Sequence, residues 1–247
     1  MRLKVSISIY CVLIMLLCSA CFDIDEQLTM KKNGSGDYAI TVSMERFINE
    51  VKDYAEDHPE SVQADEDNSE QDFSSYNSIL NDKKKLLESI QGISNVNTNF
   101  DSTKYAISIG FHFGDIQALN RGLAAAQLFT TIDNTTLPQD FKYFEWKEGV
   151  LLRHEDPNFK RSFQLPTSKV SPNADIKGMD MSMFLQDVSY TTHYVFERKL
   201  KSVNQKAINS DVSSTAITQK IFPFQSSKLG ANSLETSFEF VPNKKSK

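Results

Sequence analysis

Cysteine is scarce in this chain of 247 residues, and it is confined to one end. The three cysteines are Cys11, Cys18 and Cys21, so the sequence from residue 22 onward contains none. That stretch therefore has no residue for a disulfide bond, for a thiol nucleophile or for a zinc site built on thiolates. Mechanisms that depend on cysteine chemistry are excluded for this part of the protein.

An excess of basic residues is also missing. The chain has 27 Lys and Arg against 32 Asp and Glu, which gives a formal net charge of −5 at pH 7. Proteins that bind nucleic acids usually carry a basic surface that faces the phosphates. We therefore expect no nucleic-acid partner.

The sequence lacks the motifs of the common catalytic and nucleotide-binding sites. It has no G-x-S-x-G elbow, no Walker loop and no dinucleotide fingerprint. The four histidines (His58, His112, His154 and His193) have no partner at the spacing of a zinc site. His112 and His193 each alternate with strand residues, so we expect both on the more exposed face of a sheet. The sequence thus predicts no catalytic residue, no cofactor and no metal ligand, and a non-enzymatic role is favoured.

Long apolar runs are absent except near the beginning. Arg2 and Lys4 precede a mostly apolar segment, Val5 to Leu17, which ends in Cys18-Ser19-Ala20-Cys21. The segment has about a dozen residues, as in the core of a signal peptide, whereas a membrane-spanning helix needs about 20. The order of basic, apolar and small residues before a cysteine resembles a lipobox. That resemblance implies a signal peptide at 1–20, cleavage before Cys21 and a lipid on the Cys21 sulfur.

Two alternatives to lipidation remain open. Cys18 stands where a lipobox usually has leucine, so ordinary secretion with cleavage after Ala20 is one alternative. An uncleaved membrane anchor is the other. With lipidation, we expect an envelope protein held at a membrane, with the outer membrane favoured and its side undetermined. Strand-like alternation begins almost at once with Ile24, Leu28 and Met30, so the body should sit close to the bilayer.

The pattern of apolar and polar residues in 21–247 predicts one α+β domain. The fold class predicted is antiparallel β-hairpins with helices packed on one face, followed by a β-rich C-terminal half. Asn33-Gly34-Ser35-Gly36 indicates a hairpin turn, and Asp115 is a predicted helix cap. The predicted strands cover 38–44, 96–100, 105–113, 141–146, 150–154, 190–200, 214–222 and 234–241, and the predicted helices present Phe47 to Ala55, Ile79 to Ile90 and Ile116 to Leu123.

Residues 59–73 form an acidic stretch that we interpret as a flexible loop. A calcium loop is disfavoured, because a run starting at Asp65 has Glu70 at the position of the usual glycine and Tyr76 at that of the bidentate glutamate. A boundary within the domain is possible near 130–140, where the patterning is weak.

Carboxylates offer the second hypothesis for function. Asp23, Asp25 and Glu26 form one group and Glu155-Asp156 another, but neither has aromatic surroundings that indicate a sugar site. An envelope hydrolase would instead use carboxylates from distant strands that the fold brings together. A third hypothesis is a lipid-binding module with an apolar cavity. The densest aromatic cluster, 141–146, is interpreted as core packing rather than as a ligand patch.

Three stretches give the chain a family resemblance. Cys21 leads into a strand and then Lys32 to Tyr38, the middle stretch is Leu86 to Phe113, and a late strand contains Tyr194-Val195-Phe196. In this outline the chain resembles uncharacterised cell-envelope lipoproteins of the Bacteroidota type and, loosely, LppM-type lipoproteins. The resemblance implies an envelope location, an anchor on Cys21 and an envelope protein or lipid as partner. It implies no catalytic residues.

Overall fold

Two β-sheets and three helices make up the part of the chain that the structure, a computed structural model, describes. The described residues are 22–57, 74–126, 141–155, 188–205, 209–223 and 233–242. The signal segment with Cys21, the 59–73 loop and the 130–140 boundary lie outside these ranges. The large sheet has the strand order β3-β4-β2-β1-β7-β10-β9, and the small sheet has the order β5-β6-β11-β8.

The first hairpin lies in the middle of the large sheet. It pairs β1 (Asp23–Met30) with β2 (Gly36–Ser43) in antiparallel register. Gly34 adopts a φ of 86° in the turn, a conformation that side chains disfavour. Gly36 has no room for a side chain, because a Cβ there would overlap the carbonyl oxygen of Thr29. The predicted turn and both of its strands are confirmed.

A second hairpin and the helices complete the N-terminal half. The elements are α2 (Glu45–Asp57), α3 (Ser74–Glu88), β3 (Ile93–Asp101), β4 (Ala106–Phe113) and α4 (Ile116–Ala126). The Asp115 cap is confirmed, since its Oδ1 accepts a hydrogen bond of 2.7 Å from the amide of Ala118.

The spacing of Ile79, Leu80, Leu86, Leu87 and Ile90 predicts one apolar stripe along α3, and this prediction is wrong in part. Leu80 and Leu87 are buried, but Ile79 and Leu86 are 51% and 50% exposed. Residues one position apart on a helix point about 100° apart, so a narrow contact with the sheet buries only the 80/87 row.

The C-terminal half is β-rich, as predicted. It contains β5 (Phe144–Lys147), β6 (Val150–Arg153), β7 (Ser189–Phe196), β8 (Leu200–Gln205), β9 (Asn209–Val212), β10 (Ala216–Ile221) and β11 (Thr236–Phe240). Strands β8 and β9 were not anticipated as separate strands. One pairing also departs from the antiparallel pattern, because β7 lies parallel to β1.

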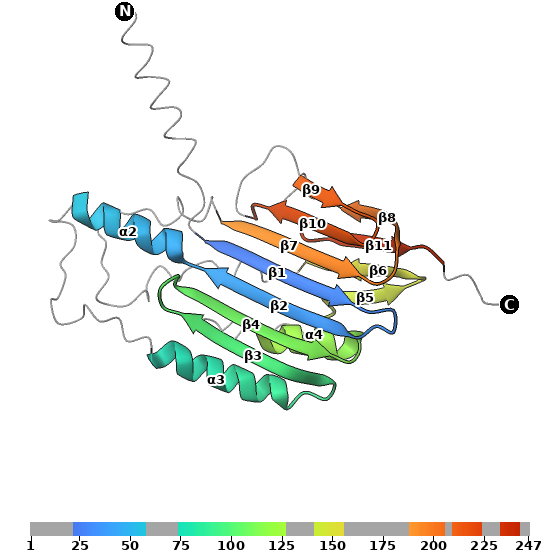
Figure 1. Ribbon diagram of the computed structural model, residues 1–247, viewed down its shortest axis with the longest axis horizontal. Coiled ribbons are helices and arrows are strands. Elements are labelled where there is room, and N and C mark those ends of the chain that lie inside the picture. Colours follow the sequence, from blue (N-terminus) through green and yellow to red (C-terminus); the bar gives the residue numbers. More distant parts are fainter. Residues whose placement is uncertain are drawn as a thin grey trace, which may run out of the picture.

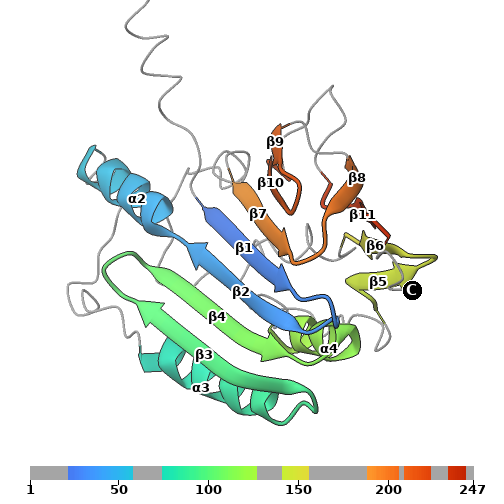
Figure 2. The same cartoon turned by 45° about the vertical axis from the view of Figure 1, so that its right-hand side comes forward.

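The two faces of the large sheet have different surroundings. Helices α3 and α4 and the small sheet pack on one face, the inner face, and Figure 1 looks onto the other, the outer face. Figure 2 shows the two helices beside β3 and β4 and the small sheet beside β7 and β10. Aromatic rings join the sheets: Tyr194 and Phe196 on β7 contact Phe238 on β11, with ring centres 5.5 and 5.0 Å apart. The core therefore lies between the large sheet and these two covers.

Candidate functional site

A carboxylate lies in the core between the two sheets. Along β1, Ile24, Leu28 and Met30 are buried on the inner face, and Glu26 shares that face with an exposed fraction of 0%. Burying an unpaired carboxylate costs many kcal/mol, so partners must surround it. The predicted acid group is therefore split, because Asp23 and Asp25 alternate with Glu26 and lie on the outer face.

The ionic partner of Glu26 is Arg153, at the end of β6 in the small sheet. Its Nη2 lies 3.2 Å from Glu26 Oε2, and the Arg153 side chain is 5% exposed. Arg153 Nη1 donates a hydrogen bond of 2.7 Å to the backbone carbonyl of His154. The guanidinium carbon also lies 5.0 Å from the ring centre of Phe144. The pair therefore links the central strand of one sheet to a strand of the other.

Tyrosines complete the surroundings of the carboxylate. The hydroxyl of Tyr190 donates a short hydrogen bond to Glu26 Oε2, and the hydroxyl of Tyr194 lies 3.3 Å from Oε1. Burial, reinforced by the Glu26 charge, raises the pKa of Tyr38, Tyr190 and Tyr194 well above the usual value near 10. All three phenols therefore stay protonated at neutral pH and can act as donors.

Arg153 likewise stays protonated and charged. Burial, the largest single effect, lowers its pKa, but the Glu26 carboxylate together with Tyr194 and Tyr190 more than offsets burial, so the pKa is raised well above the usual value. We call Glu26, Arg153, Tyr190 and Tyr194 the buried ionic centre. Its oxygens and hydroxyls are engaged with one another, which suits a structural link between sheets better than acid–base chemistry.

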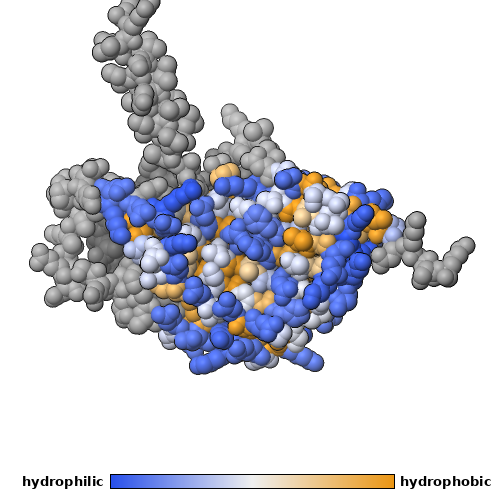
Figure 3. Space-filling model, viewed as in Figure 1, coloured by the Kyte–Doolittle hydropathy of each residue, from blue (hydrophilic) through white to orange (hydrophobic). Residues whose placement is uncertain are grey.

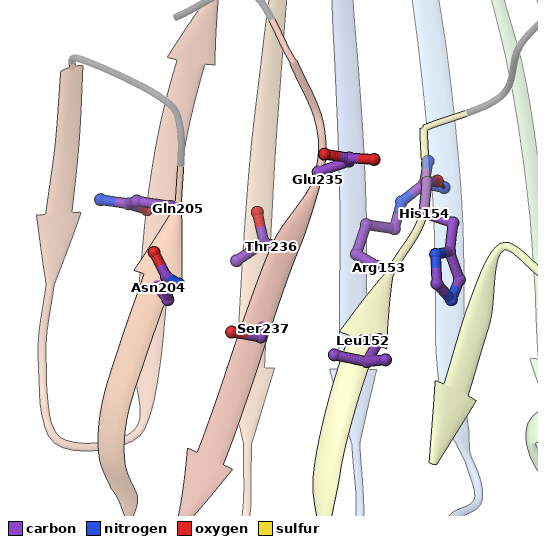
Figure 4. Close-up of a pocket in the computed structure, with 8 residues that line it drawn as sticks. All are labelled: Leu152, Arg153, His154, Asn204, Gln205, Glu235, Thr236 and Ser237. Atoms are coloured by element: carbon purple, nitrogen blue, oxygen red, sulfur yellow. Dashed lines mark hydrogen bonds between the residues drawn. The ribbon is translucent and has the colours of Figure 1, made fainter. Parts of the chain in front are cut away.

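A cavity of about 260 Å³ adjoins this centre on the small sheet. In Figure 4 its lining side chains come from the ends of β6, β8 and β11. They are Leu152, Arg153, His154, Asn204, Gln205, Glu235, Thr236 and Ser237. A buried amide supports the wall from behind, since Gln219 Nε2 donates to Gln205 Oε1 at 2.8 Å and to Thr236 Oγ1 at 3.1 Å. Seven of the eight lining residues have polar side chains, but apolar atoms contribute most of the surface that faces the cavity.

The two strand histidines lie on the outer face, as predicted. His112 Nδ1 is 2.8 Å from Asp37 Oδ1, while His193 contacts Asp25 at 3.1 Å and Thr218 at 3.0 Å. Strands β2 and β1 separate the strands that carry the two histidines. Over the described ranges, no group of three or more His, Cys, Asp or Glu could hold a metal ion. Figure 3 shows this face, where hydrophilic residues are interspersed with smaller hydrophobic areas.

The remaining predicted residues are dispersed. Glu155 accepts a hydrogen bond of 2.6 Å from Ser233, and Asp156 lies outside the described ranges, as does His58. In the aromatic cluster, Tyr143 and Phe144 are buried, which agrees with core packing, whereas Trp146 is 37% exposed and does not.

Sequence reasoning missed the buried ionic centre because it treated Glu26 as one of several surface acids. The available signal was the alternation itself. Glu26 falls between Ile24 and Leu28 on the apolar face of β1, and Arg153 follows Leu151 at the same two-residue interval on β6. A charge at an apolar position of each of two strands predicts a buried pair, although it cannot say that the two strands face each other.

Comparisons with known proteins give little beyond the fold. No family model matches the chain, and no curated protein is detectably similar to it. Among solved structures, it is similar to the folded domain of Mycobacterium tuberculosis LppM, which was determined by NMR. The two sequences are 10% identical, the match covers 91% of this chain and 94% of that chain, and the TM-score is 0.39. The expected LppM-like outline is thus met only loosely, and the Bacteroidota-type resemblance gains no support. None of the described helices is long and apolar enough to cross a bilayer.

Proposed function

We propose that this chain is a lipid-anchored protein of the bacterial cell envelope, cut before Cys21 and held at a membrane by acyl chains on the Cys21 sulfur. The outer membrane is the favoured location. Its role is to bind an envelope component rather than to catalyse a reaction. The apolar segment and the Cys18-to-Cys21 sequence motivate the anchor.

The observation that supports this proposal most strongly is that Phe22 already belongs to the fold. Its backbone carbonyl accepts a hydrogen bond of 3.0 Å from the amide of Ser189, and its ring stacks on Phe47 with centres 5.0 Å apart. Strand β1 begins at the next residue and lies in the middle of the large sheet. One residue extends the chain by at most about 3.6 Å, so a lipid on Cys21 would hold this end of the sheet directly against the bilayer.

The cavity is the candidate ligand site for the binding role. Gln219 on β10 hydrogen-bonds the cavity residue Thr236. In the large sheet, Gln219 lies opposite Thr192 on β7, and Thr192 lies opposite Glu26 on β1. Glu26 is four residues from Phe22 along a strand, which is about 13 Å. A body anchored at Cys21 would therefore present the cavity near the level of the lipid headgroups, where a small group of an envelope component could enter it.

The buried ionic centre supports the non-catalytic part of the proposal. A hydrolase that uses paired carboxylates needs two of them facing one cleft. The fold instead places Asp25 and Glu26 on opposite faces and pairs Glu26 with Arg153. Turnover of peptidoglycan, glycan or ester substrates by the purified mature protein would contradict a binding role.

The anchor is tested by labelling cells with radioactive palmitate, with and without globomycin, which blocks cleavage of lipoprotein signals. The proposal expects label on the wild-type protein, a larger precursor with globomycin, and neither effect for Cys21→Ser. Cys18→Ser is the matched control and should still be labelled. A wild-type protein that matures without label, or Cys21→Ser that matures normally and stays in the envelope fraction, would refute it.

A further inference from the structure

A guanidinium stacked on two aromatic rings lies at the end of the large sheet opposite the start of β1. Arg198 follows β7, which runs parallel to β1, so it lies beyond the last residues of both strands. In Figure 1 the ends of β1 and β7 and the β5–β6 hairpin lie on the right, opposite the end at which β1 begins. The guanidinium carbon is 4.8 Å from the ring centre of Phe240 and 5.7 Å from that of Trp146. We call Trp146, Arg198 and Phe240 the Arg198 cluster.

The guanidinium is held in place but is not neutralised. Arg198 Nε is buried without a hydrogen-bond partner, and the half-buried side chain brings its two Nη nitrogens to the surface. Among the described residues, no carboxylate forms an ion pair with Arg198. Two nearby acids are engaged elsewhere: Glu197 accepts a hydrogen bond of 3.1 Å from the amide of Lys32, and Glu239 pairs with Lys201 at 2.6 Å. A stacked guanidinium with unused donors is preorganised for a planar anion such as a carboxylate.

The turns around the cluster are basic, although the chain as a whole is acidic. The β1–β2 and β7–β8 turns are in contact, because the amide of Glu197 donates to the carbonyl of Met30 at 3.0 Å. The β5–β6 turn follows Trp146 directly. The three turns carry the cations Lys31, Lys32, Lys147, Arg198 and Lys199 and the acids Glu148 and Glu197. The net charge of the whole chain is −5, so this end has the opposite sign and would attract an acidic partner.

Exposed apolar surface borders the guanidinium. Trp146 is 37% exposed, and Val241, which follows Phe240, is 44% exposed. The amide of Val241 donates to the carbonyl of Lys199 at 2.8 Å, which keeps this apolar side chain beside the β7–β8 turn. Tryptophan and arginine are enriched among the residues that carry most of the binding energy in protein–protein interfaces. A carboxylate next to an apolar side chain would match both parts of this surface.

We propose that the Arg198 cluster binds an acidic peptide segment of another envelope protein. A carboxylate of that segment pairs with Arg198, and a neighbouring apolar side chain packs on Trp146. This inference rests on the proposed binding role and names a second site for it, apart from the cavity. The eight residues of β1 place the cluster roughly 25 Å along the sheet from the end at which the anchor would attach. That position suits a protein partner better than a lipid headgroup.

Trp146 is the only tryptophan in the chain, so its emission reports on the cluster directly. The mature protein in a nonionic detergent is titrated with a tripeptide amide in which an aspartate stands between two leucines. The matched probe has asparagine in place of the aspartate, and acetate supplies a carboxylate without apolar groups. Soluble peptidoglycan fragments test the other carboxylate-rich polymer of the envelope. Isothermal titration calorimetry repeats each measurement, because a change at Arg198 alters the emission by itself.

We expect the aspartate peptide to shift the emission saturably, with a dissociation constant of about 1 mM or lower that rises with added salt. Arg198→Met should weaken this binding by at least about tenfold, because a charge-assisted pair is lost. Arg198→Lys keeps the charge but not the planar fork, so it should also bind less tightly than the wild type. Lys201→Met is the matched control, since it removes a cation that already has a partner, and it should bind like the wild type.

Equal binding of the asparagine peptide, wild-type affinity in Arg198→Met, or no saturable signal from the aspartate peptide would overturn the inference. Tighter binding of acetate or of peptidoglycan fragments than of the aspartate peptide would overturn the choice of a protein partner. Circular dichroism identifies a variant that does not fold, and if Arg198→Met fails, Arg198→Lys decides the outcome. Palmitate labelling is measured separately, so a labelled protein that ignores the peptide refutes only this site. An unlabelled protein that binds the peptide refutes only the anchor.

Discussion

Removing Arg153 should strongly destabilise the fold, because the buried Glu26 carboxylate then loses its ionic partner. In Arg153→Met, an apolar group of similar length replaces the guanidinium and leaves the Glu26 carboxylate buried with only tyrosine donors. Breaking a buried ion pair on one side typically costs about 3–5 kcal/mol. Domains have a free energy of unfolding of about 5–15 kcal/mol, so this loss is a large fraction of the total.

The assay is urea unfolding of the soluble mature body carrying Cys21→Ser, followed by circular dichroism. With a slope of about 2 kcal/mol per M, the midpoint of Arg153→Met should fall by about 1.5–2.5 M. The double variant Glu26→Leu/Arg153→Met removes both charges together, and it should lose less stability than the two single variants added. Lys201→Met removes an exposed cation that pairs with Glu239 and should change the midpoint little, since surface pairs contribute about 0–1 kcal/mol.

Two results would refute this reasoning. One is an Arg153→Met midpoint equal to that of the Lys201→Met control. The other is strict additivity in the double variant, because residues of one network should couple by at least about 0.5 kcal/mol.

Three further outcomes follow from the same geometry. The pKa values of Tyr38, Tyr190 and Tyr194 are raised in the folded protein, so the unfolded chain loses these protons at a lower pH. The contribution of these tyrosines to the free energy of unfolding should therefore be fully present below about pH 10 and should fall above it. Each tyrosine should lower the free energy of unfolding by about 1.4 kcal/mol per pH unit. Urea midpoints between pH 8 and 11 measure this fall, and a Tyr190→Phe variant with an unchanged alkaline slope would contradict it. Asp115→Ala removes the cap of α4 and should cost about 1 kcal/mol in the same unfolding assay, whereas an unchanged midpoint would argue against the cap. Leu87→Ala should cost about 2–5 kcal/mol and its exposed neighbour Leu86→Ala less than about 1, so equal losses would show that the orientation of α3 is wrong.

The sequence predicts the local elements well because local signals determine them. The Asn33-to-Gly36 turn, the Asp115 cap and the alternation of 105–113 each depend on residues within one turn or one strand. All three features occur in the structure, as do the α+β class and the β-rich second half.

Local patterns in the sequence do not predict which distant strands pair or which elements pack together. The parallel pairing of β7 with β1 joins residues more than 160 positions apart, and no local pattern encodes it. The buried ionic centre depends on that pairing and on the packing of β6 against the large sheet. The exposed Ile79 and Leu86 mark the opposite error, because apolar spacing in a helix does not reveal how wide the contact with the sheet is.

The claim that matters most is that the mature chain starts at a lipidated Cys21, one residue before the fold begins. Mass spectrometry of the N-terminal peptide of the protein isolated from membranes tests it most directly. The account predicts a peptide that starts at Cys21 and carries a diacylglyceryl group on its sulfur. A peptide that starts elsewhere, or a Cys21 with a free thiol, would contradict it.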